Sequence, residues 1–509
     1  MKHIIRIVEK YRAFAENLKI PFGYYLLTFA AFVTLRNFLE IFSDSAKIAI
    51  ISFEGHFHYF LFYLCLALTM TLLFSVSTGE KVAETARLVT VSFFFIFLAP
   101  LLDLLISGGQ GFNMAYLLPG THSNLMVRYL TFAGPFEEQG ITMGLKLEVA
   151  VLVVASFLYF SAKQVSILKS IFFSWVVYTV IFGYAVVPFV IKGILDLFGL
   201  YNYFDSMLFV KFYLILLFPL LLIVAYRWDR KAFVSILKDI RPFRQIHALM
   251  MFAFGIVLGP SFLWSQEHLF DLAVTALAIV WGCVFVITTN NLADQEIDRW
   301  VNKQRPLVNG AIACRDYQIL AVVAGILAIA YAWAVSYYAL FTLVLFMGLY
   351  SVYSLPPVRF KRVPFFSKLV IAVNSLAFVI MGYVFTGGEV TGLPPLIILW
   401  FLVFFTAAMN FIDIKDYSGD KRVGIKTLPV LWGLEKSQRV IGLFFLLACV
   451  AAPFAVGQMI LLAPSAGAGI VQYWLISRKN YEEKWVFSVY LASFAILIVV
   501  LGFARQIAS

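Results

Sequence analysis

Two stretches of the sequence place acidic and amide side chains where a long apolar segment ends. They read NNLADQEIDRWVNKQRPL, beginning at Asn290, and NFIDIKDYSGDKRVGIKTLPVLWG, beginning at Asn410. The residues that could do chemistry are Asn290, Asp294 and Asp298 in the first stretch and Asp413, Asp416 and Asp420 in the second. An ionised carboxylate in apolar surroundings is costly unless it faces a cavity, a partner or an ion, so these residues are functional candidates. The alternative is that the first stretch is only the solvated loop after a helix.

The spacing of these residues indicates what they could bind. Asn290, Asp294 and Asp298 recur every four residues, as do Asp416 and Asp420, so in a helix each set would form one stripe. Carboxylates that share a cavity repel one another unless cations lie between them, and oxygen ligands favour a hard ion such as magnesium. Magnesium held by few carboxylates takes its other ligands from water and phosphate, so the site predicts a phosphorylated substrate.

Basic residues near the two stretches could contact phosphate oxygens. They are Arg359, Lys361 and Arg362 in YSVYSLPPVRFKRVPFFSK, and Lys421, Arg422 and Lys426 after the second acid stretch. Each of these cations is equally compatible with the ordinary excess of basic residues in cytoplasmic loops. Such loops do not need carboxylates, however, so two acid stretches at matching helix ends favour a metal site.

The composition is that of a polytopic membrane protein. Of the 509 residues, 62% are hydrophobic and 13% are charged, whereas soluble domains are about half apolar and a quarter charged. The net charge of +11 therefore favours contact with anionic lipid headgroups and not with nucleic acid. The four cysteines are scattered without the spacing of a disulfide framework or a zinc site.

Fifteen apolar segments are long enough to span a bilayer, which takes about 20 residues in a helix. Residues 1–20 precede them and fit a helix on the membrane surface, with no removable signal peptide. Arg36 and Glu40, within the first segment, are four residues apart and could pair with each other, which favours a structural role over a functional one. The predicted segments lie near 21–42, 55–76, 86–107, 144–163, 170–194, 207–226, 246–264, 270–291, 318–335, 337–353, 367–386, 393–412, 438–455, 457–476 and 485–504.

The distribution of basic residues predicts the orientation of the chain. With the N-terminus in the cytoplasm, alternate loops hold 32 of the 39 lysines and arginines. The positive-inside rule then places both acid stretches on the cytoplasmic side and the C-terminus on the other side. The polar stretch 227–244 is the best candidate for a domain boundary, which divides the chain into residues 1–235 with six segments and residues 236–509 with nine.

The acid stretches resemble the two signature loops of the UbiA-type intramembrane prenyltransferases, NDxxDxxxD and DxxDxxxD. RPFRQIH, from Arg241, and YSLPPVRFKR, from Tyr353, are similar as well, and the resemblance covers about residues 240–505. It implies an all-α ring of nine helices around a central cavity that is open to lipid and capped by the signature loops. In that family Mg²⁺ on the two motifs binds the diphosphate of an isoprenoid donor, and the chain passes to an aromatic or polar lipid acceptor.

The resemblance also implies roles for individual residues. The six acid and amide residues named above would be catalytic, and all of them except Asp413 would be metal ligands. Asn291 and Ile412 depart from the pattern, which commonly has Asp and Lys there, so one metal ligand and one phosphate contact are missing. Asn374 could face the cavity or make a helix–helix hydrogen bond. The predicted substrate-binding residues are Arg305, Tyr353, Asn374, Arg359, Lys361, Arg362, Lys421, Arg422 and Lys426.

The sequence therefore predicts magnesium-dependent transfer of an isoprenoid chain from a prenyl diphosphate to a membrane acceptor. The alternatives are another magnesium-dependent lipid transferase, such as polyprenyl transfer to a sugar phosphate or a CDP-alcohol phosphotransferase reaction, and a transporter or scaffold without catalysis. The DGxxAR stretch of CDP-alcohol phosphotransferases is missing from the sequence. The resemblance does not reach residues 1–235, which we expect to form an accessory module that packs against the ring, presents acceptor lipid or mediates homo-oligomer assembly.

Overall fold

The computed structural model describes residues 2–18, 20–44, 52–119, 124–131, 140–200, 204–260, 266–363 and 365–508. Within these ranges the chain is helical, and the only β-type pairing is an isolated bridge between Met114 and Gly140. The chain forms two compact units. One comprises Met1–Phe233 with Trp264–Asp271, and the other comprises Val234–Leu263 with Leu272–Ser509.

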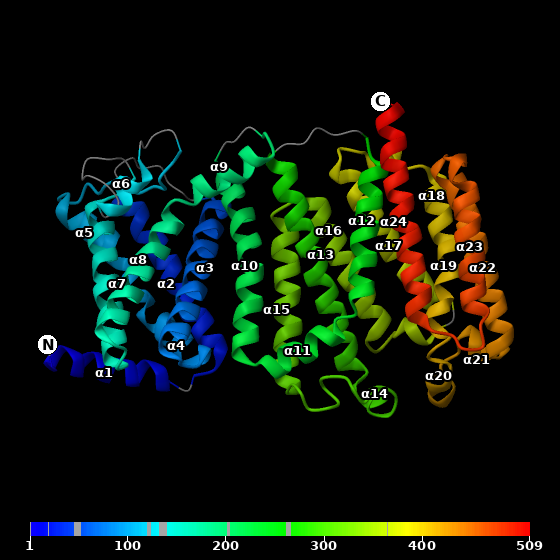
Figure 1. Ribbon diagram of the computed structural model, residues 1–509, viewed down its shortest axis with the longest axis horizontal. Helices are drawn as coiled ribbons and strands as arrows, with labels where there is room; N and C mark the ends of the chain where they lie inside the picture. Colours follow the sequence, from blue (N-terminus) through cyan, green and yellow to red (C-terminus); the bar gives the residue numbers. More distant parts are fainter. Residues whose placement is uncertain are drawn as a thin grey trace. The chain divides into compact units, whose positions relative to one another are not determined.

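The first unit is a bundle of apolar helices. Its first helix, α1, runs across the ends of α4 and α7 instead of alongside them, the orientation expected of a helix at a membrane surface (Figure 1). The elements are α1 (Lys2–Asn17), α2 (Phe22–Ser43), α3 (Phe53–Thr78), α4 (Val82–Ser92), η1 (Phe93–Phe97), α5 (Leu98–Ile106), α6 (Leu125–Leu130), α7 (Met143–Ala162), α8 (Ile167–Ala185), α9 (Val187–Leu197) and α10 (Ser206–Trp228).

The second unit follows α11 (Arg230–Asp239), which contains the boundary between the units. Its longer helices are α12 (Pro242–Leu258), α13 (Gln266–Ala293), α15 (Cys314–Trp333), α16 (Tyr337–Ser354), α17 (Phe366–Phe385), α22 (Leu434–Val456), α23 (Leu462–Ser477) and α24 (Glu483–Ala508). One further apolar segment is built from α18 (Pro395–Trp400), η4 (Phe401–Phe405), α19 (Thr406–Ala408) and η5 (Met409–Asp413). The shorter elements are α14 (Gln295–Val301), η2 (Phe360–Arg362), η3 (Val390–Gly392), α20 (Tyr417–Val423), α21 (Leu428–Trp432) and η6 (Met459–Leu461).

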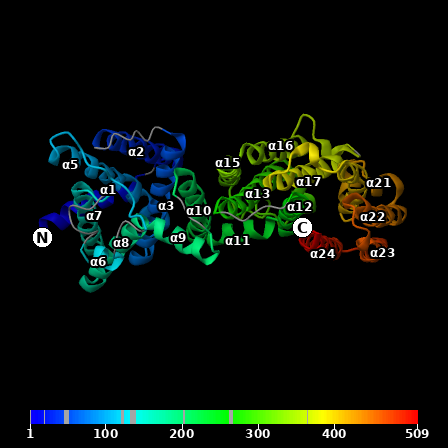
Figure 2. The same ribbon diagram turned by 90° about the horizontal axis from the view of Figure 1, so that it is seen from above.

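Close packing of α12 closes the helices of the second unit into a ring. This helix contacts both α17 and the last helix, α24, and lies beside α24 in both views (Figures 1 and 2). Glycines permit the close approach of α12 to α17. A Cβ atom on Gly255 would lie 2.0 Å from the backbone oxygen of Val379, and one on Gly382 would lie 2.0 Å from that of Phe252. Small residues at such a crossing favour tight helix association in a membrane.

The described residues include 14 helices long and apolar enough to cross a membrane, together with the shorter apolar helix Pro242–Leu258. These helices correspond to the fifteen predicted segments, and the protein is an integral membrane protein.

Two predicted boundaries were wrong. The segment predicted at 246–264 is α12, which is only 17 residues long. The segment predicted at 170–194 is interrupted after Ala185, and a new helix, α9, begins at Val187 with Pro188 in its first turn, where the missing N–H of proline is tolerated.

The orientation in the membrane remains a prediction from the basic loops. A reporter fused after Ser509, which lies outside the described residues, is expected to be extracytoplasmic, whereas one inserted near Arg230 is expected to be cytoplasmic. Protease protection or reporter activity in intact cells measures both. A cytoplasmic signal from the C-terminal fusion would contradict the predicted number of crossings.

Candidate active site

Each acid motif lies where one helical segment gives way to another. In the first, α13 ends at Ala293 and α14 begins at Gln295, so Asp294 lies at the break with φ −102° and ψ 8°. In the second, Asp416 occupies the corresponding place before α20, with φ −88° and ψ 2°. The four-residue spacing is nevertheless kept, because the backbone N–H groups of Asp294, Asp298 and Asp420 donate to the carbonyl oxygens of Asn290, Asp294 and Asp416.

All six motif residues line a single cavity of about 620 Å³ within the second unit. The cavity lies at the ends of α13 and η5 and is bordered by α11, by the beginning of α12 and by the segments that follow each acid motif. Its motif residues are Asn290, Asp294, Asp298, Asp413, Asp416 and Asp420. The structure thus brings together carboxylates that are more than one hundred residues apart in the sequence.

The acids of the first motif are paired with basic side chains. Asp294 accepts hydrogen bonds from Arg359, at 2.6 Å, and from Lys361. Asp298 forms an ion pair of 2.8 Å with Arg305 and accepts a bond of 2.9 Å from Asn302. These contacts hold the carboxylates in place, and they put cations close to where an anionic substrate would meet them.

The acids of the second motif are less completely neutralised. Asp413 pairs with the buried Lys368 at 2.5 Å, but no ion pair joins Asp416 or Asp420 to a basic side chain within the described part of the chain. Burial, together with the nearby carboxylates of Asp413 and Asp416, raises the pKa of Asp420 to about 7. Burial also raises the pKa of Asp416. Burial thus disfavours the ionised forms of both carboxylates, and a bound cation would favour them.

Basic side chains crowd the same cavity. Burial and the neighbouring guanidinium groups of Arg244 and Arg305 lower the pKa of Arg241 to about 9. Arg241 and Arg359 also adopt the left-handed backbone region, with φ 54° and 49°. Residues other than glycine enter this region at a cost of about 1–3 kcal/mol, often at functional sites. The cavity therefore contains buried carboxylates close to several basic side chains, a combination that fits a divalent cation bound together with a polyanion.

Asn291, one of the two departures from the family pattern, is not directed into this cavity. Its amide donates to Asp239 at 2.5 Å and to the hydroxyl oxygen of Tyr317 at 2.9 Å, and its carbonyl accepts from Arg305. An aspartate here could not donate to Asp239. Asn291 thus positions Arg305, which reaches Asp298 from the cavity wall.

A second, apolar cavity of about 100 Å³ shares Arg244, Tyr353 and Ile412 with the polar one. The other departure from the pattern, Ile412, therefore lies where polar and apolar surroundings meet. The walls of the apolar cavity include Cys283, Val286, Ile287, Phe346, Phe378 and Phe487. The polar cavity and the apolar cavity therefore adjoin one another.

A small polar cluster lies in the wall of the apolar cavity. The two ring nitrogens of His247 make hydrogen bonds with Ser375, at 3.0 Å, and Tyr490, at 2.9 Å. Asn374 is 2% exposed, and neither polar atom of its amide has a hydrogen-bond partner among the described residues. A buried amide without a partner is costly, so this position suits a polar group of a bound molecule.

The predicted substrate-binding residues fall into two groups. Arg305, Tyr353 and Lys361 line the polar cavity, Asn374 lines the apolar one, and Arg359 reaches the polar cavity through its bond to Asp294. The side chains exposed to solvent and absent from both cavities are Arg362, Lys421, Arg422 and Lys426. They lie on outward faces of η2 and the segment around α20, where Lys421 packs over the ring of Tyr417.

Several residues of the two cavities were not singled out from the sequence. Arg241 and Arg244 belong to RPFRQIH, and Lys368 ends the quoted basic stretch, so their motifs pointed to the right region. No sequence signal pointed to the contact between His247 and Tyr490. They are 243 positions apart, and only the closure of the ring brings them together.

Comparison with known proteins gives one consistent family. A model of the UbiA prenyltransferase family matches residues 248–496. The digeranylgeranylglyceryl phosphate synthase of Thermococcus sibiricus is 29% identical over 249 residues, which cover 49% of this chain and 82% of the relative. The enzyme of the same name from Pyrococcus horikoshii is 30% identical over 235 residues, covering 45% and 79%. A solved UbiA homologue from Archaeoglobus fulgidus, bound to DMAPP and Mg²⁺, is 20% identical and covers 53% of this chain and 98% of its own, with a TM-score of 0.45.

Proposed function

Because the chain belongs to the UbiA prenyltransferase family and is a prenyltransferase, we propose that it transfers an isoprenoid chain from a prenyl diphosphate to a membrane acceptor. The diphosphate would lie with magnesium between the two acid motifs. The observation that carries this proposal is the single polar cavity in which both motifs and a set of basic side chains meet, adjoining an apolar cavity.

The carboxylate and amide oxygens of the cavity suit a magnesium ion that arrives together with its substrate. The described residues contain no group of three His, Cys, Asp or Glu side chains placed to hold a metal ion by themselves. Magnesium is usually held by one or two carboxylates, with water and substrate phosphates completing its shell. The ligands we propose are Asn290, Asp294, Asp298, Asp416 and Asp420, all of which line the cavity.

The basic residues would bind the diphosphate and stabilise its charge as it leaves. We propose this role for Lys361 and Arg305; both line the cavity beside a motif carboxylate, which supports it. Arg244 lies at the junction of the two cavities, where the bond between the diphosphate and the isoprenoid carbon would break. Bound magnesium would neutralise part of the charge that accumulates on the departing diphosphate.

The apolar cavity would hold the reacting end of the chain and exclude water. An allylic carbocation must be captured by the acceptor before water reaches it, and walls such as Phe346 and Phe378 favour this. We propose that Asn374 holds a polar group of the acceptor, which its unpartnered amide in the wall of this cavity supports. Residues 1–235 lie outside the matched family segment, and we propose that they form an accessory module.

Metal and diphosphate should bind cooperatively if the site works in this way. We expect Mn²⁺, used as a paramagnetic substitute for Mg²⁺, to bind the full-length protein about 5–150-fold more tightly when a non-reactive geranylgeranyl thiolodiphosphate is present. Electron paramagnetic resonance of free Mn²⁺ measures the affinity with and without the analogue. Geranylgeraniol, which has the same chain but no diphosphate, is the control and should leave the Mn²⁺ affinity unchanged. The same affinity with and without the thiolodiphosphate would contradict the proposed site.

A further inference from the structure

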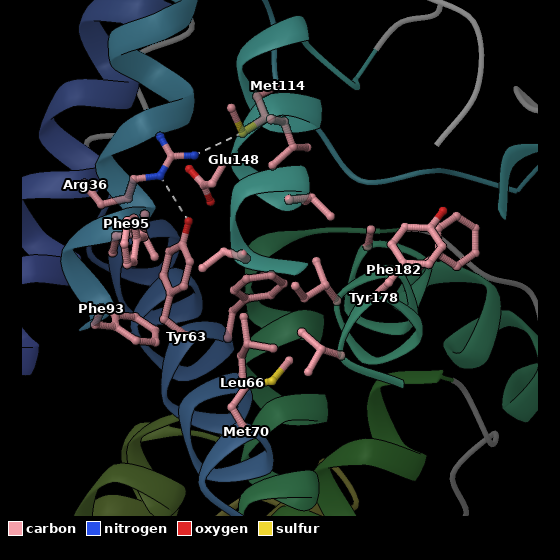
Figure 3. A pocket seen from close by; sticks show the side chains of 18 of the residues that line it. Arg36, Tyr63, Leu66, Met70, Phe93, Phe95, Met114, Glu148, Tyr178 and Phe182 are labelled. Atoms are coloured by element: carbon pink, nitrogen blue, oxygen red, sulfur yellow. Dashed lines mark hydrogen bonds between the residues drawn. The ribbon is translucent and has the colours of Figure 1, made fainter. Parts of the chain in front are cut away.

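The first unit contains a cavity of its own, far in the sequence from either acid motif. It has a volume of about 220 Å³ and is walled by α2, α3, α4, η1, α7 and α8, together with the segment around Met114. Most of its wall is apolar, with side chains such as Phe62, Leu66, Met70 and Leu152. Figure 3 shows Leu66 and Met70 at one end and Arg36, Glu148 and Met114 gathered at the other. The cavity thus has an apolar length and a polar end.

Arg36 at the polar end has hydrogen-bonding capacity to spare. It is 1% exposed and lies within a membrane-spanning helix, where a charged side chain is costly and usually functional. Its Nε donates to the Tyr63 hydroxyl at 3.2 Å, and one terminal nitrogen donates to the Met114 sulfur, a weak acceptor, at 3.1 Å. The other terminal nitrogen lies 3.6 Å from Glu40, as expected for that pair, but has no hydrogen-bond partner among the described residues.

Glu148 supplies an acceptor at the same end. Its side chain is 6% exposed, and one carboxylate oxygen accepts the backbone N–H of Ala99 at 2.9 Å. In Figure 3 the carboxylate points toward the Arg36 guanidinium. The charged residues that line the cavity are Arg36, Lys146, Glu40 and Glu148, whose formal charges cancel. The polar end therefore offers donors and acceptors without a net charge.

A second hollow adjoins the polar end. This hollow, of about 390 Å³, shares Glu40, Tyr59, Met114 and Tyr116 with the cavity, and its wall includes Asp44, His56 and Asp205. A molecule could therefore keep its polar head near this hollow while its apolar part fills the cavity.

From these features we propose that the first unit binds a lipid with one apolar chain and an uncharged, hydroxyl-bearing headgroup. A hydroxyl can accept a hydrogen bond from Arg36 and donate one to Glu148, whereas a phosphate or carboxylate would only accept and would face two carboxylates. The chain occupies the apolar length of the cavity, where its burial drives binding. This site does not depend on prenyl transfer, since it lies wholly within the first unit.

Photolabelling of the full-length protein in detergent tests the proposal. The probes are a diazirine-bearing hexadecanol and the corresponding hexadecyl phosphate and hexadecanoic acid, with adducts mapped by peptide mass spectrometry. We expect the alcohol to label peptides of α3, α7 and α8 most strongly. Leu152→Trp fills the cavity and should lower this labelling by about tenfold, the loss expected when about two methylene groups are displaced. Ile181→Trp, on α8, is a second filling variant in case the first does not fold.

Two comparisons make the result decisive. Val154→Trp lies on the same helix as Leu152, but its side chain is 58% exposed, so it should leave the labelling unchanged. Glu148→Gln keeps an oxygen for the Ala99 N–H but removes a charge, and should raise labelling by hexadecanoic acid relative to the alcohol. Equal labelling in the cavity-filling and exposed tryptophan variants, or stronger labelling of wild-type protein by the acid or the phosphate than by the alcohol, would overturn the proposal.

Discussion

Replacing Asp416 by Asn is expected to lower the turnover of prenyl transfer by about two or more orders of magnitude, or about 3 kcal/mol of barrier. The amide keeps the shape of the side chain but removes a charged ligand from the cavity. Asp416 is the most informative position, because no ion pair joins it to a basic side chain in the described residues. Asp294→Asn should cost as much, but it also removes the negative charge that pairs with Arg359 and Lys361. Turnover of well-folded protein at saturating Mg²⁺ measures both effects.

Glu296→Gln is the matched control for these changes. Glu296 is two positions from Asp294, but its side chain is exposed and does not line the cavity. Its replacement should change the activation barrier by no more than about 0.5 kcal/mol. Combining Asp294→Asn with Asp416→Asn should cost less than the sum of the two, because groups that serve the same ions act as a unit. Wild-type turnover in Asp294→Asn would return the first stretch to the solvated-loop interpretation, and wild-type turnover in Asp416→Asn would contradict its assignment as a metal ligand.

The second large effect is expected on stability, at the ion pair between Lys368 and Asp413. Both side chains are buried, and the pair joins α17 to η5 beside the polar cavity. Lys368→Met would leave the Asp413 carboxylate buried without its partner, which typically costs about 3–5 kcal/mol. Thermal unfolding in detergent should therefore show a clear fall in Tm. Adding Asp413→Leu should restore much of the loss, because the uncompensated charge is then removed.

The pair between Lys415 and Glu483 provides the comparison. Lys415 is 41% exposed at its side chain, so solvent screens the interaction and Lys415→Met should cost no more than about 1 kcal/mol. If Lys368→Met and Lys415→Met lowered Tm equally, the Lys368–Asp413 pair would not hold α17 to η5 as the structure indicates.

The sequence predicted those features that depend on local composition and spacing. Apolar segments of sufficient length identified the spanning helices, because a bilayer allows few other conformations. The two acid motifs were found because carboxylates are rare at the ends of such segments. The break at Pro188 was missed, since hydropathy alone does not record where a proline restarts a helix.

Features that depend on packing between distant segments could not be predicted. Lys361 and Arg362 are adjacent in the sequence and chemically alike, yet only Lys361 lines the cavity, because the turn at η2 points them in different directions. The direction of Asn291 is set by Asp239 and Tyr317, which lie on other helices. In the first unit, the approach of Glu148 to Arg36 likewise follows from helix packing and not from any motif.

The most direct test of whether the two acid motifs bind the prenyl donor is to measure the release of labelled diphosphate from geranylgeranyl diphosphate. The full-length protein is supplied with this donor and a membrane lipid extract as the source of acceptor, and Mg²⁺ is titrated. Release is expected to rise from background to saturation with Mg²⁺, to disappear with EDTA and in Asp416→Asn, and to persist in Glu296→Gln. Release that is unchanged by EDTA, or that proceeds at the wild-type rate in Asp416→Asn, would contradict the proposed site.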